Sequence, residues 1–199
     1  SVLPARAADG EVILYRVNAG GDQVNATDGG PNWGRDDANS GSNRSPYYKG
    51  DRTQFFSFGA DNLGGPVQGA APADVYSMGR QATHSNPTIR YEFPVTAGRT
   101  YRINLYFADP RTSDRDGSNR VFNVSVNGSV PSAFNNITLP RIRQGNRWYY
   151  RVPVMVTAEV TATDSSLDLV WSRVGQSGSP YPVVSGIEII ELVPQDTTP

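Results

Sequence analysis

The sequence predicts an all-β fold, namely an antiparallel two-sheet β-sandwich of the jelly-roll type. Short segments alternate apolar and polar residues with a period of two, which is typical of half-buried strands. Turn-forming Gly, Asn, Asp and Pro residues separate these segments, and no window combines a helical period with helix caps. Many short strands joined by turn-rich loops are typical of sandwiches and related β architectures.

The clearest strand pair lies in the middle of the chain, within residues 98–128. Apolar residues of the segment 101–107 fall on one face, and the segment 122–126 repeats the pattern. Asn127 and Gly128 then supply the positive-φ pair of a tight turn. A polar loop over residues 109–120 joins the two strands and is too long for a simple turn. Loops of this kind on a rigid scaffold often carry binding groups.

The remaining strands are predicted from the same alternation, taken in chain order. The strand that covers residues 150–156 contains Pro153, which places it at an edge or a bulge. Residues 18–65 are dense in Gly, Asn and Asp with aromatic residues set among them, and a loop of this length is often functional. The other predicted strands cover residues 12–17, 74–80, 88–95, 137–142, 167–171 and 183–192.

Length and composition predict one globular domain. The chain has 199 residues, of which 37% are hydrophobic, and we assign the domain to residues 11–192. Residues 1–10 are small and show no period, so they predict an N-terminal tail or linker. Residues 193–199 are rich in Pro and Thr and predict a linker to a following module. The chain is therefore expected to be one module of a larger protein.

Charge and cysteine content exclude several classes of protein. The formal net charge is -1 and the Lys and Arg residues are scattered, which argues against a nucleic-acid partner. No apolar run approaches the length of a bilayer crossing, so membrane insertion is not expected. The chain has no cysteine, and a cysteine-free composition rich in Gly, Asn, Ser and Thr is common in secreted bacterial modules. We therefore expect an extracellular protein, secreted or at the cell surface.

The sequence offers little for catalysis. The only histidine, His84, lies in a loop, and neither a G-x-S-x-G elbow nor a glycine-rich phosphate loop is present. Two acidic pairs, Asp36/Asp37 and Asp114/Asp116, could hydrolyse a glycosidic bond if they faced each other across a cleft. Asp residues in such loops are mostly turn formers, however, so we predict that the protein is not an enzyme.

A calcium site is the one cofactor alternative that the residues leave open. The segment 114–119 offers oxygen ligands around a glycine turn, as loops for hard cations do. It lacks the downstream bidentate Glu of the EF-hand pattern. We therefore predict no cofactor, with Ca²⁺ as the alternative.

Aromatic residues in polar loops favour carbohydrate binding. Sugars present apolar C–H faces ringed by hydroxyls, so their sites combine a flat ring for stacking with polar groups that donate and accept hydrogen bonds. We expect such rings to be held out to water at one rim of the sandwich, although some could instead close the core. The predicted ligand-binding residues are Trp33, Tyr47, Tyr48, Tyr76, Arg80, Asp109 and Tyr181.

Several short motifs follow one another in a fixed order along the chain. They are N-A-G-G at residues 18–21, Y-x-x-x-R at 76–80, Y-x-F-P-V at 91–95, F-A-D at 107–109, R-V-F-x-V-x-V-N-G at 120–128 and G-I-E-I at 186–189. In this order the motifs resemble those of the malectin domain family, and they cover most of residues 16–192.

The resemblance implies a β-sandwich close to the galactose-binding-like folds, with a carbohydrate-binding role and no catalytic activity. Tyr76 and Arg80 match the Y-x-x-x-R element near the family's ligand loops, and Asp109 stands where the family's F-A-E acid follows its strand. Two aromatics that follow this acid in the family are replaced here by Pro-Arg-Thr at residues 110–112. Pro180 and Tyr181 replace another ligand-contacting feature, so sugar specificity does not transfer.

Taken together, the sequence predicts a non-catalytic carbohydrate-binding module of a larger secreted or surface protein. Its expected partners are a glycan or oligosaccharide and the neighbouring modules of the same chain. The alternative is a structural or adhesive spacer domain of a bacterial surface protein, with or without Ca²⁺. An adjoining hydrolase in the parent protein would favour the first function, and tandem Ig-like repeats would favour the second.

Overall fold

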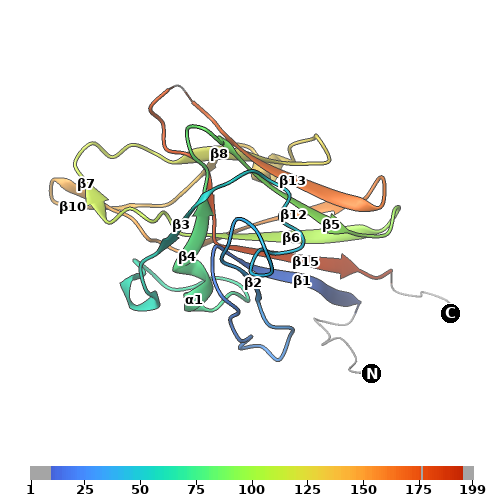
Figure 1. The fold of residues 1–199 in the computed structure, drawn as a ribbon. Coiled ribbons are helices and arrows are strands. Elements are labelled where there is room, and N and C mark those ends of the chain that lie inside the picture. Colours follow the sequence, from blue (N-terminus) through green and yellow to red (C-terminus); the bar gives the residue numbers. More distant parts are fainter. Residues whose placement is uncertain (1–9, 176, 195–199) are drawn as a thin grey trace.

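The computed structural model describes residues 10–175 and 177–194 (Figure 1). It is mostly β, as predicted, but its described strands form four sheets where the sequence predicts two. The predicted tail at residues 1–10 and the predicted linker at residues 193–199 lie largely outside the described residues. Among the residues described, none of the helices has the length and hydrophobicity that a bilayer crossing needs.

The largest sheet has five strands in the order β12-β6-β15-β1-β2. Its pairings are antiparallel except for that of β1 with β2, which is parallel and departs from the predicted all-antiparallel arrangement. The central predicted strand becomes β6, which pairs with β12 on one side and β15 on the other. The strands are β1 (Glu11–Ala19), β2 (Gly34–Asp36), β6 (Thr100–Phe107), β12 (Val154–Thr161) and β15 (Gly186–Leu192).

A four-stranded sheet in the order β5-β13-β8-β9 packs against the first sheet. In Figure 1, β8 and β13 lie above β15 and β1. The alternating apolar residues of both sheets form one buried cluster, which includes Leu105 of β6, Ile187 of β15 and Trp171 of β13. The strands are β5 (Thr88–Pro94), β8 (Val121–Val126), β9 (Ile137–Thr138) and β13 (Ser166–Arg173).

Two small sheets and three short helices complete the described fold. One small sheet, β10-β11-β7, projects to the left in Figure 1, and the other has the order β14-β4-β3. The elements of the first are β7 (Ser113–Asp114), β10 (Ile142–Gln144) and β11 (Arg147–Tyr149). Those of the second are β3 (Gln54–Ser57), β4 (Met78–Gln81) and β14 (Val183–Val184). The helices are η1 (Ala60–Asn62), α1 (Ala73–Tyr76) and η2 (Ser132–Phe134).

The predicted strand over residues 74–80 is wrong in its first half. Residues up to Tyr76 form the helical turn α1, and β4 begins only at Met78. The consecutive residues Val75 and Tyr76 are both buried. A strand would have pointed one of them away from the core, whereas a helical turn can bury both.

Other strand boundaries also differ from those predicted from the sequence. The strand predicted over residues 150–156 starts at Val154, after Pro153, and Arg151 has a φ of 66°. Proline cannot donate to a sheet ladder, and a left-handed residue interrupts a strand. The predicted strand over residues 137–142 is divided between β9 and β10. The irregular stretch 18–65 contains β2 and β3.

A bulge in β1 decides which of its residues face away from the core. The pairing with β15 shifts register between Ile13 and Tyr15. Val17 belongs to the core cluster and Tyr15 packs against it, while Ile13 lines a cavity together with Arg16. Simple alternation predicts Ile13 on the same face as Tyr15, so the bulge places it on the opposite face.

Candidate functional site

The predicted ligand-binding residues do not converge on one site. Trp33 and Tyr76 are fully buried and pack edge-on against Tyr106, with ring centroids 5.3 and 5.7 Å away. The hydroxyl of Tyr76 donates a hydrogen bond of 2.6 Å to the carbonyl of Gln68, and burial raises its pKa. The expectation that these two rings lie at a solvent-exposed rim is wrong, because they fill a second apolar cluster beside α1.

Asp109 and Tyr181 are linked through an arginine. The buried carboxylate of Asp109 accepts hydrogen bonds from Arg111 at 2.7 Å and from Arg120 at 3.2 Å, and Arg120 also donates to the carbonyl of Tyr181. Burial acts to raise the pKa of Asp109, but the hydrogen bonds and charges of Arg111 and Arg120 outweigh it and lower the pKa. The acid is therefore held in internal ion pairs.

Tyr47 lies apart from all of these residues. It is half-buried, and its ring centroid is 4.8 Å from that of Tyr15 and 5.1 Å from that of Phe93. Tyr181 is also half-buried, and its hydroxyl lies 3.2 Å from Nδ1 of His84. Both rings keep a partly exposed surface.

Tyr48 and Arg80 are brought together in a buried cluster around Asp36. Arg80 Nε donates to Asp36 Oδ2 at 2.7 Å and Arg80 Nη2 donates to Asp36 Oδ1 at 2.6 Å, which makes a bidentate ion pair. Tyr91 donates its hydroxyl to the same carboxylate. The remaining N–H groups of Arg80 reach Asn39, Thr53 and the carbonyl of Ala38, so each of its donors has an acceptor.

Two aromatic rings contact the guanidinium of this cluster. Its central carbon lies 3.7 Å from the ring centroid of Tyr48 and 4.9 Å from that of Phe55. Tyr48 is fully buried, so the expectation of an exposed ring is wrong here as well. Phe55, in contrast, is 39% exposed. Cation–π contact with a buried arginine therefore holds an exposed ring in place.

A groove of about 650 Å³ runs beside Phe55, and we call it the Phe55 groove. Its exposed polar residues are Arg52, Gln54 and Ser85. Two asparagines of the wall are fixed by hydrogen bonds, since Asn86 Nδ2 donates to the carbonyl of Arg52 at 3.0 Å and Asn39 Oδ1 accepts from the amide of Thr53 at 2.9 Å. The groove thus combines one flat ring with several hydrogen-bonding side chains.

Sequence reasoning missed Phe55 as a site residue. Its signal was the pair Phe55-Phe56 in a turn-rich segment, because adjacent residues of a strand point to opposite faces. Phe56 is half-buried and stacks with Phe58 at a centroid distance of 6.2 Å, which leaves Phe55 on the other face of β3. β3 lies at the edge of its small sheet.

Three of the four acidic residues considered for catalysis or metal binding are engaged in hydrogen bonds or ion pairs within the protein. Asp36 is paired with Arg80, and Asp37 accepts from Arg35 at 2.7 Å. Asp114 accepts from the hydroxyl of Tyr150 at 2.7 Å and from the amide of Gly117 at 2.8 Å. In the part of the chain that the structure describes, His, Asp and Glu side chains do not gather in threes as a metal site would require.

Comparison with known proteins gives a family and a fold. A family model described as the malectin domain matches residues 13–175. No curated protein matches the sequence. The ANXUR1 extracellular domain from Arabidopsis thaliana has a similar structure, with a TM-score of 0.69 and 17% identity over 92% of this chain and 49% of that chain.

Two further solved structures are similar over the same extent. The plant receptor-like kinase FER gives a TM-score of 0.68 and 19% identity, covering 94% of this chain and 51% of that chain. The structure of the plant peptide RALF23 in complex with FER and LLG2 gives 0.63 and 20%, covering 91% and 49%. The chain thus spans about half the length of these relatives, and at such identities the likeness shows a shared fold. The expected bacterial source gains no support from these plant proteins.

Proposed function

The chain belongs to the malectin domain family, and we propose that it is a non-catalytic carbohydrate-binding module that holds its glycan in the Phe55 groove. The observation that carries the proposal is the exposed ring of Phe55, fixed against the buried guanidinium of Arg80 and bordered by polar side chains. An aromatic face beside hydrogen-bonding groups suits the apolar C–H face and the hydroxyls of a sugar. The cavity of about 650 Å³ lies within the range of ligand sites.

Each side chain of the groove has a distinct role in this proposal. Phe55 stacks on a sugar ring, while Arg52, Gln54 and Ser85 exchange hydrogen bonds with its hydroxyls. Arg80, whose donors are all engaged inside the protein, positions the ring and does not touch the ligand. Because contacts in an open groove are few and hydrated, we expect a dissociation constant between about 1 μM and 1 mM.

The finer features of fold and setting belong to the same proposal. We propose that the two large sheets form a jelly-roll sandwich of the galactose-binding-like type, and that the domain works outside the cell beside other modules. The extracellular setting is supported by the description of the ANXUR1 relative as an extracellular domain. Tyr47 and Tyr181, which are half-buried, stay predicted ligand-binding residues, and we propose that they contact a longer glycan.

Calorimetric titration of glucans, xylans and galactans tests the proposal. Phe55→Ala should weaken binding about tenfold or more, taking ~1–2 kcal/mol as the contribution of a stacking ring. Tyr149→Ala is the matched control, because Tyr149 is 37% exposed and lies on β11, outside the groove. Absence of binding to every glycan, or equal losses in both variants, would overturn the proposal and leave the structural or adhesive spacer as the better account.

A further inference from the structure

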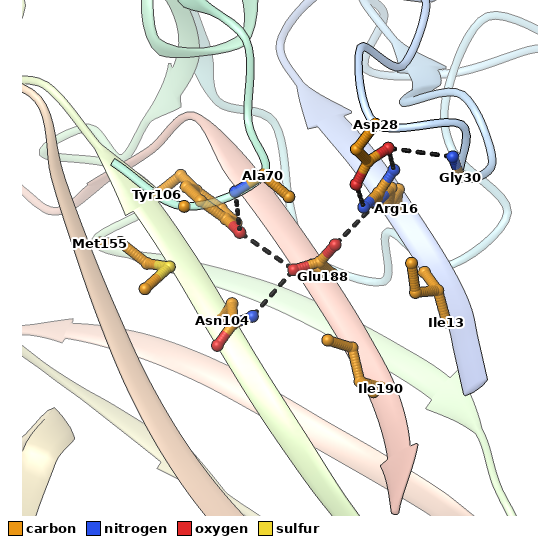
Figure 2. A pocket seen from close by; sticks show the side chains of 11 residues that line it. Ile13, Arg16, Asp28, Gly30, Ala70, Asn104, Tyr106, Met155, Glu188 and Ile190 are labelled. Carbon is orange, nitrogen blue, oxygen red and sulfur yellow. Dashed lines mark hydrogen bonds and ion pairs between the residues drawn. The ribbon is translucent and has the colours of Figure 1, made fainter. Parts of the chain in front are cut away.

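A second polar cluster lies on the face of the five-stranded sheet that points away from the core (Figure 2). Glu188 of β15 lies near its centre, flanked by Asn104 and Tyr106 of β6 and by Arg16 of β1. A cavity of about 300 Å³ opens beside these side chains, and we call it the Glu188 pocket. None of its residues belongs to the Phe55 groove.

The side-chain donors of Asn104, Tyr106 and Arg16 are all engaged in hydrogen bonds to the carboxylates of the Glu188 pocket. Glu188 Oε1 accepts from Asn104 Nδ2 at 2.8 Å and from the Tyr106 hydroxyl at 2.9 Å. Glu188 Oε2 accepts from Arg16 Nε at 2.7 Å. The other nitrogens of Arg16 donate to both oxygens of Asp28, at 2.6 and 2.9 Å.

The charges of this cluster do not balance. Within residues 10–175 and 177–194, Arg16 is the one cation paired with Glu188 and Asp28, so these three groups together carry one surplus negative charge. The side chain of Glu188 is only 2% exposed. Water therefore screens the charge of Glu188 poorly, whereas the 38% exposed side chain of Asp28 is screened more, so Glu188 acts most strongly on whatever enters the pocket.

An unpaired acceptor belongs to one of the residues that line the Glu188 pocket. Asn104 is 7% exposed, and its Oδ1 has no hydrogen-bond partner among the residues that the structure describes. Figure 2 shows its amide nitrogen turned toward Glu188 and its oxygen on the opposite side. Buried acceptors are nearly always paired in folded proteins, so an unpaired one at a cavity indicates a missing donor. A ligand that complements this pocket should therefore supply hydrogen-bond donors that carry positive charge.

The remaining wall is apolar and limits what can carry that donor. Ile13, Met155 and Ile190 line the cavity beside the polar groups. The volume of about 300 Å³ lies at the lower end of the range for ligand sites. The carrier of the charged group should therefore be compact and present carbon atoms to these three side chains.

We propose that the Glu188 pocket binds a primary ammonium group on a compact, partly apolar body. An ammonium has three donors and no acceptor, which matches the unpaired Asn104 Oδ1 and the surplus charge of Glu188 and Asp28. Amino sugars and aliphatic amines share this chemistry. A neutral sugar of the same shape lacks the charge and should bind much more weakly.

The test is a titration of the whole chain, followed by NMR, with glucosamine, cadaverine and glucose at a pH at which both amines are protonated. We expect at least one amine to bind at least tenfold more tightly than glucose. Binding of glucosamine but not cadaverine assigns the ammonium to an amino sugar, and the reverse assigns it to an aliphatic amine. Failure of both amines to bind the folded wild-type chain would overturn the proposal.

Two variants locate the binding. Glu188→Gln removes the surplus negative charge of the cluster. Met155→Trp fills the cavity with a larger side chain at a half-buried position. This second variant tests the site even if Glu188→Gln does not fold. Each should weaken amine binding at least tenfold, whereas Tyr149→Ala should leave it unchanged. Amine binding that persists in folded Met155→Trp would overturn the site. Glycan titration of Met155→Trp separates this inference from the Phe55 groove, which that substitution does not touch.

Discussion

Two buried arginine–carboxylate clusters, built from the same kinds of residue, are used differently in this molecule. In the Arg80 cluster one arginine faces one carboxylate, that of Asp36, and both side chains are fully buried. In the Arg16 cluster one arginine serves both Glu188 and Asp28. The charges of the first cluster balance, and its arginine contacts the exposed ring of Phe55. The second leaves charge and an unpaired acceptor beside a cavity. The balance of charges, more than the degree of burial, therefore distinguishes the Arg80 cluster, which supports a ring, from the Arg16 cluster, which lies beside a binding pocket.

The largest effect is expected from breaking the balanced cluster. Arg80→Met would leave the carboxylate of Asp36 buried without its partner, and removing one member of a buried ion pair costs about 3–5 kcal/mol. We expect a loss of this size in the free energy of unfolding, measured by urea denaturation. Arg35→Met is the control, because Arg35 and Asp37 form a partly exposed pair that should contribute about 0–1 kcal/mol. Equal losses in both variants would contradict the comparison.

A pair of smaller changes sharpens the comparison. Tyr91 donates to Asp36 and Tyr106 donates to Glu188, so each Phe substitution removes one hydrogen bond to a buried carboxylate. Tyr91→Phe and Tyr106→Phe should each lower the free energy of unfolding by about 1.5–3 kcal/mol, measured by urea denaturation.

The two tyrosine variants should differ in ligand binding. Tyr106→Phe leaves Glu188 with one donor fewer beside its cavity, so amines should bind this variant more tightly, whereas Tyr91→Phe should leave amine binding unchanged. The same NMR titration measures both. A tighter amine complex in Tyr91→Phe would show that the clusters are not independent.

How far the sequence predicts the fold depends on whether burial follows a local period. The strands β6, β8 and β13 were predicted because every second residue enters the core. The helical turn α1 was missed because Val75 and Tyr76 are buried consecutively. Gly20 of the N-A-G-G motif has a φ of 75°, and a Cβ there would lie 2.2 Å from the carbonyl oxygen of Gly79, a close approach that no local pattern announces.

The candidate site was less predictable for the same reason. Asp36 and Arg80 were both noticed in the sequence, but their pairing joins positions 44 residues apart. Aromatic residues in a turn-rich segment were expected at the surface, yet Trp33 and Tyr48 are fully buried while Phe55 is exposed. Sequence composition gives the number of rings in a loop. Tertiary contacts decide which of them reaches solvent.

The smallest expected effect concerns the acid that unbalances the Arg16 cluster. Hydrogen bonds from Arg16 outweigh burial and lower the pKa of Asp28 to about 2. Because this pKa lies below the ordinary Asp value of about 3.9, the ionised form stabilises the fold above that value, and its contribution is lost as the pH falls toward 2. Asp28→Asn should therefore flatten the fall in the free energy of unfolding over this range.

Urea denaturation at about pH 6 and about pH 3 measures this effect, and the exposed Asp61→Asn serves as the control. The side chain of Asp28 is 38% exposed, so solvent screening keeps the difference small. The same substitution leaves Arg16 and Glu188 as a one-to-one pair, like Arg80 and Asp36. Amine binding should then weaken. An Asp28→Asn variant that keeps both the acid-range slope and full amine affinity would show that the surplus charge does not drive binding.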